Sequence, residues 1–303
     1  MTRFISLETF VLERTSTSYQ RRFQRVLDHI GQNLDGELNL RALSQVAAFS
    51  EFHFHRQFSA WFDISASRFV KLKRLNLAAH QLAYRDSRII DIALNCGYEN
   101  PEAFSRVFKG FFSQTPSDFR KAPNWASWLV LINTLSEQRI IGVEHNYNND
   151  DVEIVRFPET RIAVLAHMGD PKRIAESVRK FITWRKEHGL PPSKSATFNI
   201  LHNDPSEVPA SEYRFDICAE IKAAVMKNEL GVYEDIIPSG LCAKLRHMGS
   251  SDHLHEAITY IYREWLPDSS SEPRDFPLFV QRVRSFPDCS EQDAITDVFL
   301  PIC

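Results

Sequence analysis

The sequence predicts a multidomain protein, with an all-α domain at the N-terminus and an α+β domain at the C-terminus. From Leu40 to Arg120 the apolar residues recur at positions i, i+3, i+4 and i+7, the spacing of short amphipathic helices. Beyond Asp150 apolar and polar residues alternate in short runs, which is typical of strands. The segment at 155–169 recurs at 235–249, which indicates an internal repeat in this second half. We expect domains at residues 1–123 and 151–303, joined by a linker at 124–150.

Length, composition and charge agree with two folded domains of different character. The chain has 303 residues, of which 43% are hydrophobic and 25% charged. Residues 1–125 carry 17 Lys+Arg against 12 Asp+Glu, a balance of +5, whereas the rest carries 19 against 27, a balance of −8. A basic half can approach a polyanion, and an acidic half is repelled from one. Because no apolar run is long enough for a secretory signal or a membrane span, we expect a cytoplasmic protein with no membrane contact.

The cysteine, histidine and acidic residues show no spacing that strongly predicts a metal site. The five cysteines contain no C-x-x-C pair, which argues against a disulfide framework and a zinc site. His253, His255 and Glu256 form the other candidate cluster, but residues i and i+2 on a helix point apart. We therefore expect no metal and no cofactor, and buried thiols at Cys96, Cys218, Cys242, Cys289 and Cys303.

Two helix-turn-helix units are predicted in the basic half. The first joins Leu40–Ala47 to Glu51–Trp61, and the second joins Ile89–Cys96 to Pro101–Phe111. Between them, Ser65–Tyr84 predicts about 30 Å of helix, close to the spacing of about 34 Å between successive major grooves on one face of DNA. A single chain is thus expected to reach two adjacent grooves. The helix-start signals are Ser50, Ser65, Asn100, Pro101, Pro116 and a capping box of Thr115 with Asp118.

The segments LRALSQVAAFSEFHFHRQF and RIIDIALNCGYENPEAFSRVFKGFFSQTPSDFRK resemble the double helix-turn-helix of AraC-type transcription regulators. The resemblance implies a regulator, an activator by our interpretation, that binds double-stranded promoter DNA and acts with RNA polymerase. Two positions depart from the pattern, because Asp63 and Ser113 stand where the family usually has glycine. If these positions need a positive φ, aspartate tolerates it better than serine.

The resemblance also implies which residues face the bases. Arg56 and Arg106 suit bidentate pairing with guanine, Glu102 suits cytosine N4, and Ala103 or Phe52 suits the thymine methyl group. An exposed arginine contacts phosphate about as often as it contacts a base, so both interpretations stay open. The base-facing set is Phe52, His55 and Arg56 in the first recognition helix and Pro101, Glu102, Ala103 and Arg106 in the second. Candidates for phosphate contacts, or for a solvated face, are Lys71, Lys73, Arg74, Lys109 and Lys121.

The acidic half contains the internal repeat. VRFPETRIAVLAHMG (155–169) aligns with DIIPSGLCAKLRHMG (235–249), and Trp184 and Trp265 follow these segments at nearly the same interval. The pattern predicts two pseudo-symmetric strand-helix-strand-strand repeats with a cleft along their joint axis. The repeat by itself explains why histidine recurs at 167 and 247, so we expect these two side chains to form local hydrogen bonds.

Over residues 150–303 this half resembles the GyrI-like effector-binding domain, on its two HMG turns, Asp204-Pro205, Trp265-Leu266-Pro267 and the terminal TDVFLPI. The resemblance implies a small-molecule pocket between the repeats, often lined by aromatic residues and a carboxylate that recognises lipophilic cations. Gln281, or Phe279 if the alignment shifts, takes the place of that carboxylate. A neutral amide does not offset the desolvation of a cation, so we expect a neutral or polar effector. The pocket candidates, each equally compatible with ordinary core, are Trp184, Phe198, Trp265, Phe279 and Gln281.

Three functions follow from these patterns. The leading hypothesis is a non-enzymatic regulator in which a small-molecule effector changes how the basic half binds DNA. A GyrI-like small-molecule hydrolase is the second, although the sequence has no G-x-S-x-G, Walker or H-E-x-x-H motif. The third is a C-terminal domain that binds a protein partner, for which a shallow apolar patch would replace a closed aromatic pocket.

Overall fold

The computed structural model divides the chain into two compact units, Met1–Glu144 and His145–Cys303. It describes residues 21–62, 64–137, 147–205 and 208–303. The side chains of Phe52 and Ala60 are also outside the described part.

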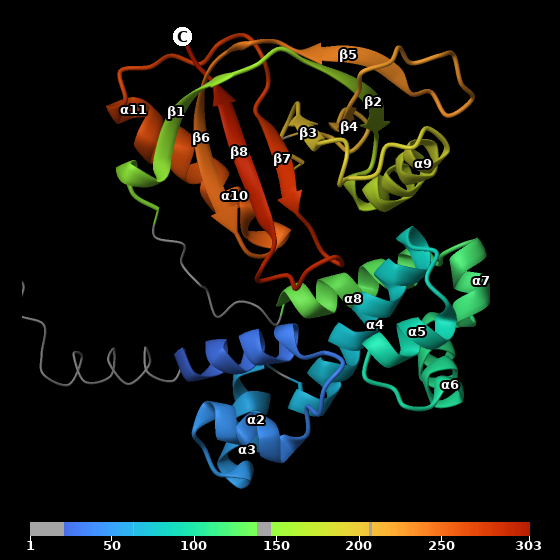
Figure 1. Cartoon of the computed structure of the whole chain (residues 1–303). Coiled ribbons are helices and arrows are strands. Elements are labelled where there is room, and N and C mark those ends of the chain that lie inside the picture. The colour runs from blue at the N-terminus through green and yellow to red at the C-terminus, as the bar shows by residue number, and fades with distance from the viewer. Residues whose placement is uncertain (1–20, 63, 138–146, 206–207) are drawn as a thin grey trace, which may run out of the picture. The chain divides into compact units, whose positions relative to one another are not determined.

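The first unit is helical throughout its described residues, as the periodicity predicts (Figure 1). The long α4 contacts α3, α5, α7 and α8, so it connects the two helix-turn-helix units. Its 19 residues span about 28 Å. After a helical segment at residues 21–32, the elements are α2 (Leu40–Ala47), α3 (Glu51–Phe62), α4 (Ala66–Tyr84), α5 (Ile89–Asn95), α6 (Pro101–Phe112), α7 (Pro116–Lys121) and α8 (Trp125–Glu137).

The predicted helix starts are confirmed by their hydrogen bonds. Ser65 accepts from the Arg68 N–H, and Asn100 accepts from the N–H groups of Glu102 and Ala103. Thr115 caps α7 by accepting from Asp118 N, but the Asp118 carboxylate accepts from the Thr115 hydroxyl, not from the backbone N–H of a full capping box.

Of the two positions where the AraC-type pattern usually has glycine, Ser113 adopts a backbone conformation that favours glycine. Ser113 ends α6 with a φ of 57°, in the left-handed region that glycine adopts most easily. The expected positive φ therefore occurs with serine in place. Asp63, the other departure, lies outside the described residues.

The core of each helix-turn-helix unit is a ladder of phenylalanines on its second helix. Phe54, Phe58 and Phe62 on α3 are 0–1% exposed, and Phe104, Phe108 and Phe112 on α6 are fully buried. Adjacent rings lie 4.4 Å apart at Phe58–Phe62 and at Phe108–Phe112. Both ladders use the spacing i, i+4, i+8, which places one stripe of each helix in the core. The first ladder residue, Phe54, corresponds to Phe104, so the two helices repeat the same buried face.

The apolar helix α8 belongs to the first unit, although it falls within the predicted linker at 124–150. Trp128 is 2% exposed and donates its indole N–H to Asn76 Oδ1 on α4 at 2.9 Å. Leu131 and Leu135, one and two turns further on, are also buried. Burial of this stripe on α4 makes α8 part of the helical core.

The second unit is α+β and contains an eight-stranded antiparallel sheet in the order β1-β6-β8-β7-β3-β4-β2-β5. The two predicted repeats are confirmed as β2-α9-β3-β4 and β6-α10-β7-β8. The strands are β1 (Val152–Phe157), β2 (Thr160–Met168), β3 (Thr197–Leu201), β4 (Arg214–Glu220), β5 (Tyr233–Ile237), β6 (Gly240–Met248), β7 (Phe279–Arg284) and β8 (Ile295–Pro301). The helices are α9 (Ile174–Glu187), α10 (Leu254–Tyr260) with a π-helical continuation at Ile261–Trp265, and α11 (Leu266–Asp268).

The pseudo-two-fold axis passes between β3 and β7. Phe198 pairs with Gln281, Asn199 with Val280, and Ile200 with Phe279. Exchange of the two repeats maps this register onto itself, so they join in one continuous sheet. The outer strands cross between the repeats: β1, which precedes the first repeat, pairs with β6 of the second, and β5, which precedes the second repeat, pairs with β2 of the first.

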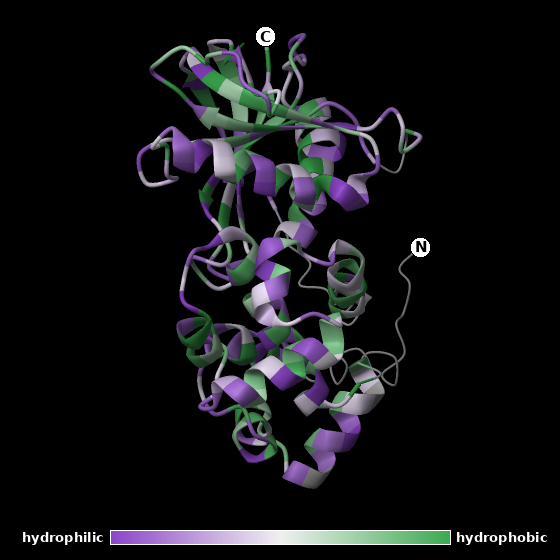
Figure 2. Ribbon diagram, turned by 90° about the vertical axis from the view of Figure 1, so that its right-hand side faces the viewer, coloured by the Kyte–Doolittle hydropathy of each residue, from purple (hydrophilic) through white to green (hydrophobic). Residues whose placement is uncertain are grey.

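The sheet has two different faces. One face packs against the helices in two clusters: Trp184 lies in the α9 cluster, and Trp265 lies in the cluster that includes α10. The opposite face holds a third cluster that contains Phe157, Phe198 and Phe279. Successive side chains alternate between the faces, as a pleated sheet requires. Figure 2 shows the strands of this unit as mainly hydrophobic and the helices as mixed in hydropathy along their length.

The histidines of the two HMG turns form local hydrogen bonds, as expected. His167 Nε2 lies 3.1 Å from Asp170 O and His247 Nε2 lies 2.9 Å from Ser250 O. The second ring nitrogen meets a hydroxyl in each case, that of Ser177 or Tyr147. The repeated histidines therefore fix equivalent turns.

The prediction that all cysteines are buried is wrong at two positions. Cys96, Cys218 and Cys242 are buried, but Cys289 is partly exposed in the turn between β7 and β8, and Cys303 is exposed after β8. Both residues lie outside the strands, and the apolar character of a thiol does not by itself ensure burial there.

Candidate functional site

The two recognition helices, α3 and α6, present equivalent arginines opposite their buried ladders. Arg56 and Arg106 each lie two positions after a ladder phenylalanine, about 200° further around the helix. Both arginines are exposed. Because Arg56 follows Phe54 as Arg106 follows Phe104, they occupy matching positions on the two helices. This geometry suits two guanidinium groups directed at one extended ligand.

The other predicted base-facing residues lie near the starts of the same helices. His55 and Glu102 are exposed, and Pro101 and Ala103 are partly exposed in the first turn of α6. The side chain of Phe52 lies outside the described part. His53, which the sequence patterns above do not single out, is exposed and occupies on α3 the position of Ala103 on α6. The alignment of the two phenylalanine ladders is the signal that identifies it.

The basic candidates on the helices divide into exposed and internal residues. Lys71, Lys109 and Lys121 are exposed, whereas Lys73 is only 6% exposed and faces the core. Arg74 donates from Nε to Leu34 O at 2.9 Å and from Nη2 to Gly36 O at 2.7 Å. Its guanidinium group also lies so close to Gly97 that a Cβ atom there would overlap it.

Arg74 therefore joins two segments of the first unit. The carbonyls of residues 34 and 36 precede α2, and Gly97 lies in the turn between α5 and α6. The guanidinium group is also 6.0 Å from the Tyr98 ring. We assign Arg74 to the packing between the two helix-turn-helix units and do not retain it as a phosphate contact.

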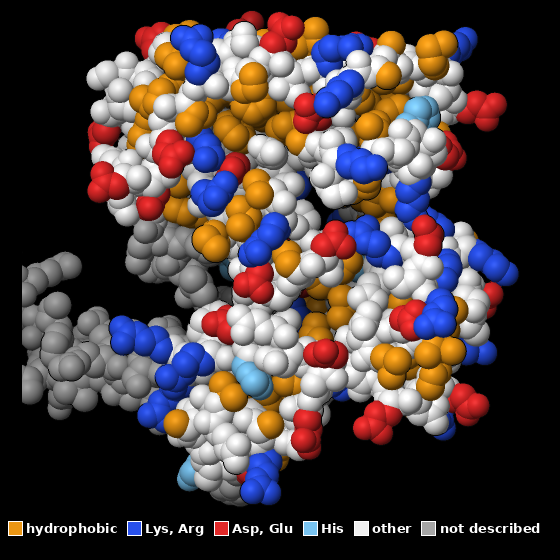
Figure 3. Space-filling model, viewed as in Figure 1, with side chains coloured by type: hydrophobic (Ala, Val, Ile, Leu, Met, Phe, Trp, Pro, Cys, Tyr) orange, Lys and Arg blue, Asp and Glu red, His pale blue; other side chains and the backbone are white. Residues whose placement is uncertain are grey.

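In the second unit, the helix-free face of the sheet forms an aromatic cluster across both repeats, which we call the phenylalanine face. Its rings are Phe157, Phe198, Phe279 and Phe299, each 7% exposed or less. Phe279 and Phe299 stack at 5.0 Å, and Phe157 packs edge-on against Phe279 at 4.9 Å. Figure 3 shows hydrophobic side chains gathered over the strands of this unit, with charged groups among them.

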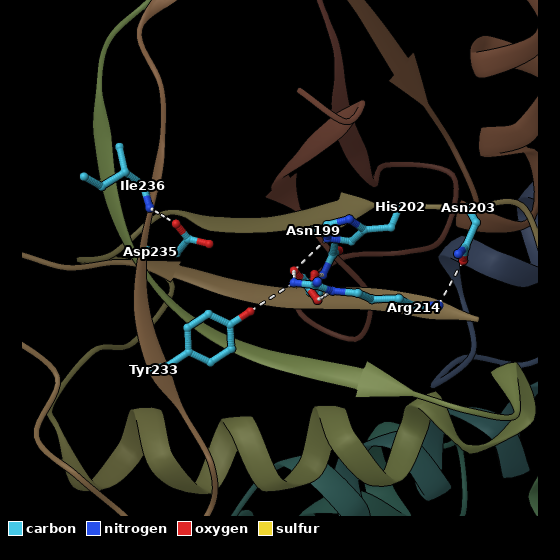
Figure 4. Close-up of polar contacts among 8 residues, drawn as sticks. Asn199, His202, Asn203, Arg214, Tyr233, Asp235 and Ile236 are labelled. Atoms are coloured by element: carbon cyan, nitrogen blue, oxygen red, sulfur yellow. Dashed lines mark hydrogen bonds and ion pairs between the residues drawn. The ribbon is translucent and has the colours of Figure 1, made fainter. Parts of the chain in front are cut away.

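An ion cluster adjoins these rings in the first repeat. Asp216 on β4 has a side chain only 2% exposed and accepts two hydrogen bonds from Arg214, at 3.0 and 2.7 Å. His202 Nε2 lies 2.8 Å from Asp216 Oδ2, and Arg214 also donates to the hydroxyl of Tyr233 (Figure 4). Burial alone would raise the pKa of Asp216, but these hydrogen bonds outweigh it and hold that pKa below its ordinary value.

The second repeat has an equivalent cluster. Asp297 on β8 corresponds to Asp216 on β4 and accepts from Arg246 at 2.7 and 2.9 Å. Lys244 lies 3.9 Å from Asp297 and 3.2 Å from Glu153. Both buried aspartates are thus paired with arginine, so neither offers an uncompensated negative charge to a ligand.

The five predicted pocket residues do not line one site. Phe198, Phe279 and Gln281 lie together on the phenylalanine face, where Gln281 pairs with both Phe198 and Asp297. Trp184 is 1% exposed and Trp265 is 6% exposed, and both lie on the helix-bearing face in separate clusters. These two tryptophans are core residues of the repeats.

The His253, His255 and Glu256 cluster is also occupied by local contacts. His253 Nδ1 lies 2.7 Å from Glu256 Oε1, and His255 Nδ1 lies 3.0 Å from Asp252 O. Within the described residues there is no group of three or more His, Cys, Asp or Glu side chains that could hold a metal ion.

These units define a class of protein: a helical unit with two helix-turn-helix motifs, combined with a duplicated sheet unit that carries an aromatic face. Comparison with known families agrees. Residues 43–122 match a helix-turn-helix domain, and residues 150–302 match the GyrI-like small molecule binding domain. The chain belongs to the AraC-type transcription regulators and carries a C-terminal GyrI-like domain.

Individual relatives match one unit or the other. The probable transcriptional regulator YgiV of Escherichia coli K12 is 35% identical over 50% of this chain and 96% of its own length. The regulatory protein SoxS of Salmonella typhimurium is 32% identical over 34% of this chain and 96% of its own length. The HTH-type regulator YbfP of Bacillus subtilis is 37% identical over 34% of this chain and 35% of its own length.

The protein is therefore a DNA-binding transcription regulator with a GyrI-like effector-binding domain. None of the helices in the described ranges is long and apolar enough to cross a membrane.

Proposed function

We propose that the protein is a non-enzymatic, one-component activator in the cytoplasm, which reads promoter DNA with α3 and α6 and acts with RNA polymerase. The matching positions of Arg56 and Arg106 carry the proposal. Each arginine is exposed on a helix whose opposite face is fixed by a phenylalanine ladder. A rigid helix with an outward guanidinium group suits bidentate recognition of guanine in the major groove.

We propose that the contacts of the two helices divide into base and phosphate contacts. The candidates for contacts with the base edges are Arg56, Arg106, Phe52, His53, His55, Glu102 and Ala103. The candidates for contacts with the phosphates are Lys71, Lys109 and Lys121. Pro101 fixes the first turn of α6 and has no N–H to donate.

The DNA contacts are tested by alanine variants at the two arginines. Arg56→Ala and Arg106→Ala should each cost about 1–3 kcal/mol of binding free energy and relax base preference at one position. Arg263→Ala is the matched control, because Arg263 is an exposed arginine of the second unit. Binding is measured by fluorescence anisotropy on a site selected from random DNA, at fixed salt concentration. A uniform loss across all sequences would identify phosphate contacts instead.

We propose further that the effector is a neutral or polar small molecule that binds at the phenylalanine face. The aromatic rings form an apolar cluster across both repeats, and Gln281 supplies a neutral donor and acceptor beside them. Asp216 and Asp297 are both paired with arginine, which disfavours a lipophilic cation. Effector binding would alter DNA binding only if its affinity differs between two arrangements of the protein.

One carboxylate on this face makes the charge prediction testable. Glu220 pairs with Ile162 of the phenylalanine cluster and has no ion pair among the described residues. A thermal-shift screen of the full chain with neutral, anionic and cationic compounds should give hits among neutral compounds, and Gln281→Leu should reduce them. Hits confined to lipophilic cations and lost in Glu220→Gln would overturn the neutral effector. Hits that are unchanged in both variants would place the effector elsewhere.

A further inference from the structure

The helix-bearing face of the sheet contains an arginine without a carboxylate partner. Arg282 on β7 donates from Nε to Asn199 Oδ1 at 3.0 Å. Its Nη1 donates to Ser251 Oγ at 2.8 Å and to Thr296 Oγ1 at 3.3 Å. Within the described part of the chain, no carboxylate lies within 4.0 Å of this guanidinium group and its Nη2 makes no hydrogen bond.

The burial of this guanidinium group without a carboxylate costs desolvation free energy. Asn199 and Thr296 are 6% and 2% exposed, so the inner side of the guanidinium group is removed from water. Burial lowers the pKa of Arg282 to about 10. The outer side reaches the surface, because Ser251 is exposed. A desolvated cation that is open on one side is stabilised by an anion from solution.

The hydroxyl groups around Arg282 are further hydrogen-bond donors for a ligand. The oxygens of Ser251 and Thr296 accept from Arg282, so their own protons remain available for a further acceptor. Glu256 on α10 lies 2.7 Å from His253 Nδ1. The two N–H groups of Nη2 and two hydroxyl donors suit a tetrahedral oxyanion.

The first repeat shows that the fold does not need these polar groups. Arg282 pairs with Thr296 on β8 as Leu201 pairs with Phe215 at the equivalent place on β4. Ser251 follows the N-cap Ser250 as Pro171 follows the N-cap Asp170. Three equivalent positions are thus apolar in one repeat and polar in the other.

Arg185 shows what a structural arginine looks like in the same unit. Its Nε donates to Leu190 O, Nη1 to the Thr197 hydroxyl and Nη2 to Ser195 O, and these bonds hold the loop between α9 and β3. Burial also lowers the pKa of Arg185 to about 10. All three nitrogens of Arg185 have acceptors, whereas Nη2 of Arg282 has none among the described residues.

We propose that Arg282, Ser251 and Thr296 form an oxyanion-binding site, which takes phosphate, sulfate or the phosphate group of an organic ligand. The site is separate from the phenylalanine face, because Arg282 and Gln281 are consecutive on β7 and point to opposite faces. It does not depend on the effector proposed above.

The test is a titration of the full chain with inorganic phosphate at constant ionic strength, followed by the NMR signal of the Arg282 Nε–H group, which Arg282→Lys assigns. We expect a saturable change in the wild type and in the control Arg263→Met. Arg282→Leu, which introduces the residue of the first repeat, should lose the phosphate-dependent rise in melting temperature. Ser251→Ala and Thr296→Val should each weaken binding by about tenfold, and they carry the test if Arg282→Leu does not fold.

A change that is linear and unsaturated, or equal in all variants, would mean an adventitious ion only and would overturn the proposal. A second titration with phenyl phosphate distinguishes the sources. Tighter binding than inorganic phosphate identifies an organic phosphate, and equal affinity identifies a free oxyanion.

Discussion

One partly buried histidine should make the stability of the first unit depend on pH. The His80 ring on α4 packs edge-on against Trp128 at 4.7 Å and against Tyr84 at 5.6 Å. Burial, with the nearby charges of Arg85 and Lys73, lowers the pKa of His80 from 6.5 to about 3. The folded protein therefore holds His80 neutral, whereas the unfolded chain binds a proton below pH 6.5.

The magnitude follows from linkage between protonation and folding. Since the unfolded state binds the extra proton, stability is full above the unfolded pKa and falls by about 1.4 kcal/mol per pH unit below it, until the folded pKa is reached. Between pH 7 and pH 5 the free energy of unfolding should fall by about 2 kcal/mol through His80 alone. His80→Phe keeps an aromatic ring against Trp128 and removes the titration.

The assay is urea unfolding of the full chain at pH 7 and pH 5, monitored by circular dichroism and tryptophan fluorescence. Other titrating groups contribute equally to the wild type and to His80→Phe, so the difference between their pH dependences isolates His80. An equal loss of stability in both proteins would refute this reasoning and show that His80 is protonated in the folded state.

Three further predictions concern the packing described above. Phe108→Ala should destabilise the first unit by about 3–5 kcal/mol because it opens the α6 ladder, measured by thermal unfolding. Arg74→Met should cost about 2 kcal/mol through its lost hydrogen bonds to Leu34 and Gly36, against less than about 0.5 kcal/mol for exposed Lys71→Met, measured by urea unfolding. Asp216→Asn should destabilise the second unit at pH 7 by an amount that shrinks as the pH falls below 3.8 toward the lowered pKa of Asp216, and a pH-independent loss would contradict this ion-pair role.

The sequence predicts helices and strands well here because local signals agree with tertiary packing. The ladder phenylalanines of α3 and α6 satisfy both the helical period and the buried face, and Ser65 and Asn100 mark the helix starts. The internal repeat predicts two copies of one strand-helix-strand-strand unit, and the structure joins these copies through the pairing of β3 with β7.

The functional residues are harder to predict, because burial and binding need the same residue types. Trp184 and Trp265 appear as pocket candidates, yet they face the helices, and only the strand register separates the two faces of the sheet. Arg74 appears as an exposed cation of α4, but its acceptors are the carbonyls of Leu34 and Gly36, far earlier in the chain. No local pattern contains contacts at that separation.

Both halves of the protein repeat their buried framework and vary the residues around it. The two recognition helices share the ladder and the arginine that follows it, but His53 faces solvent where α6 has Ala103. The two sheet repeats share the paired aspartates, but one has Leu201 where the other has Arg282. A shared framework preserves the fold, while the residues around it differ between the copies. Under the functions proposed above, the two helices would therefore read unlike DNA half-sites and the two sheet repeats would not bind equivalent molecules.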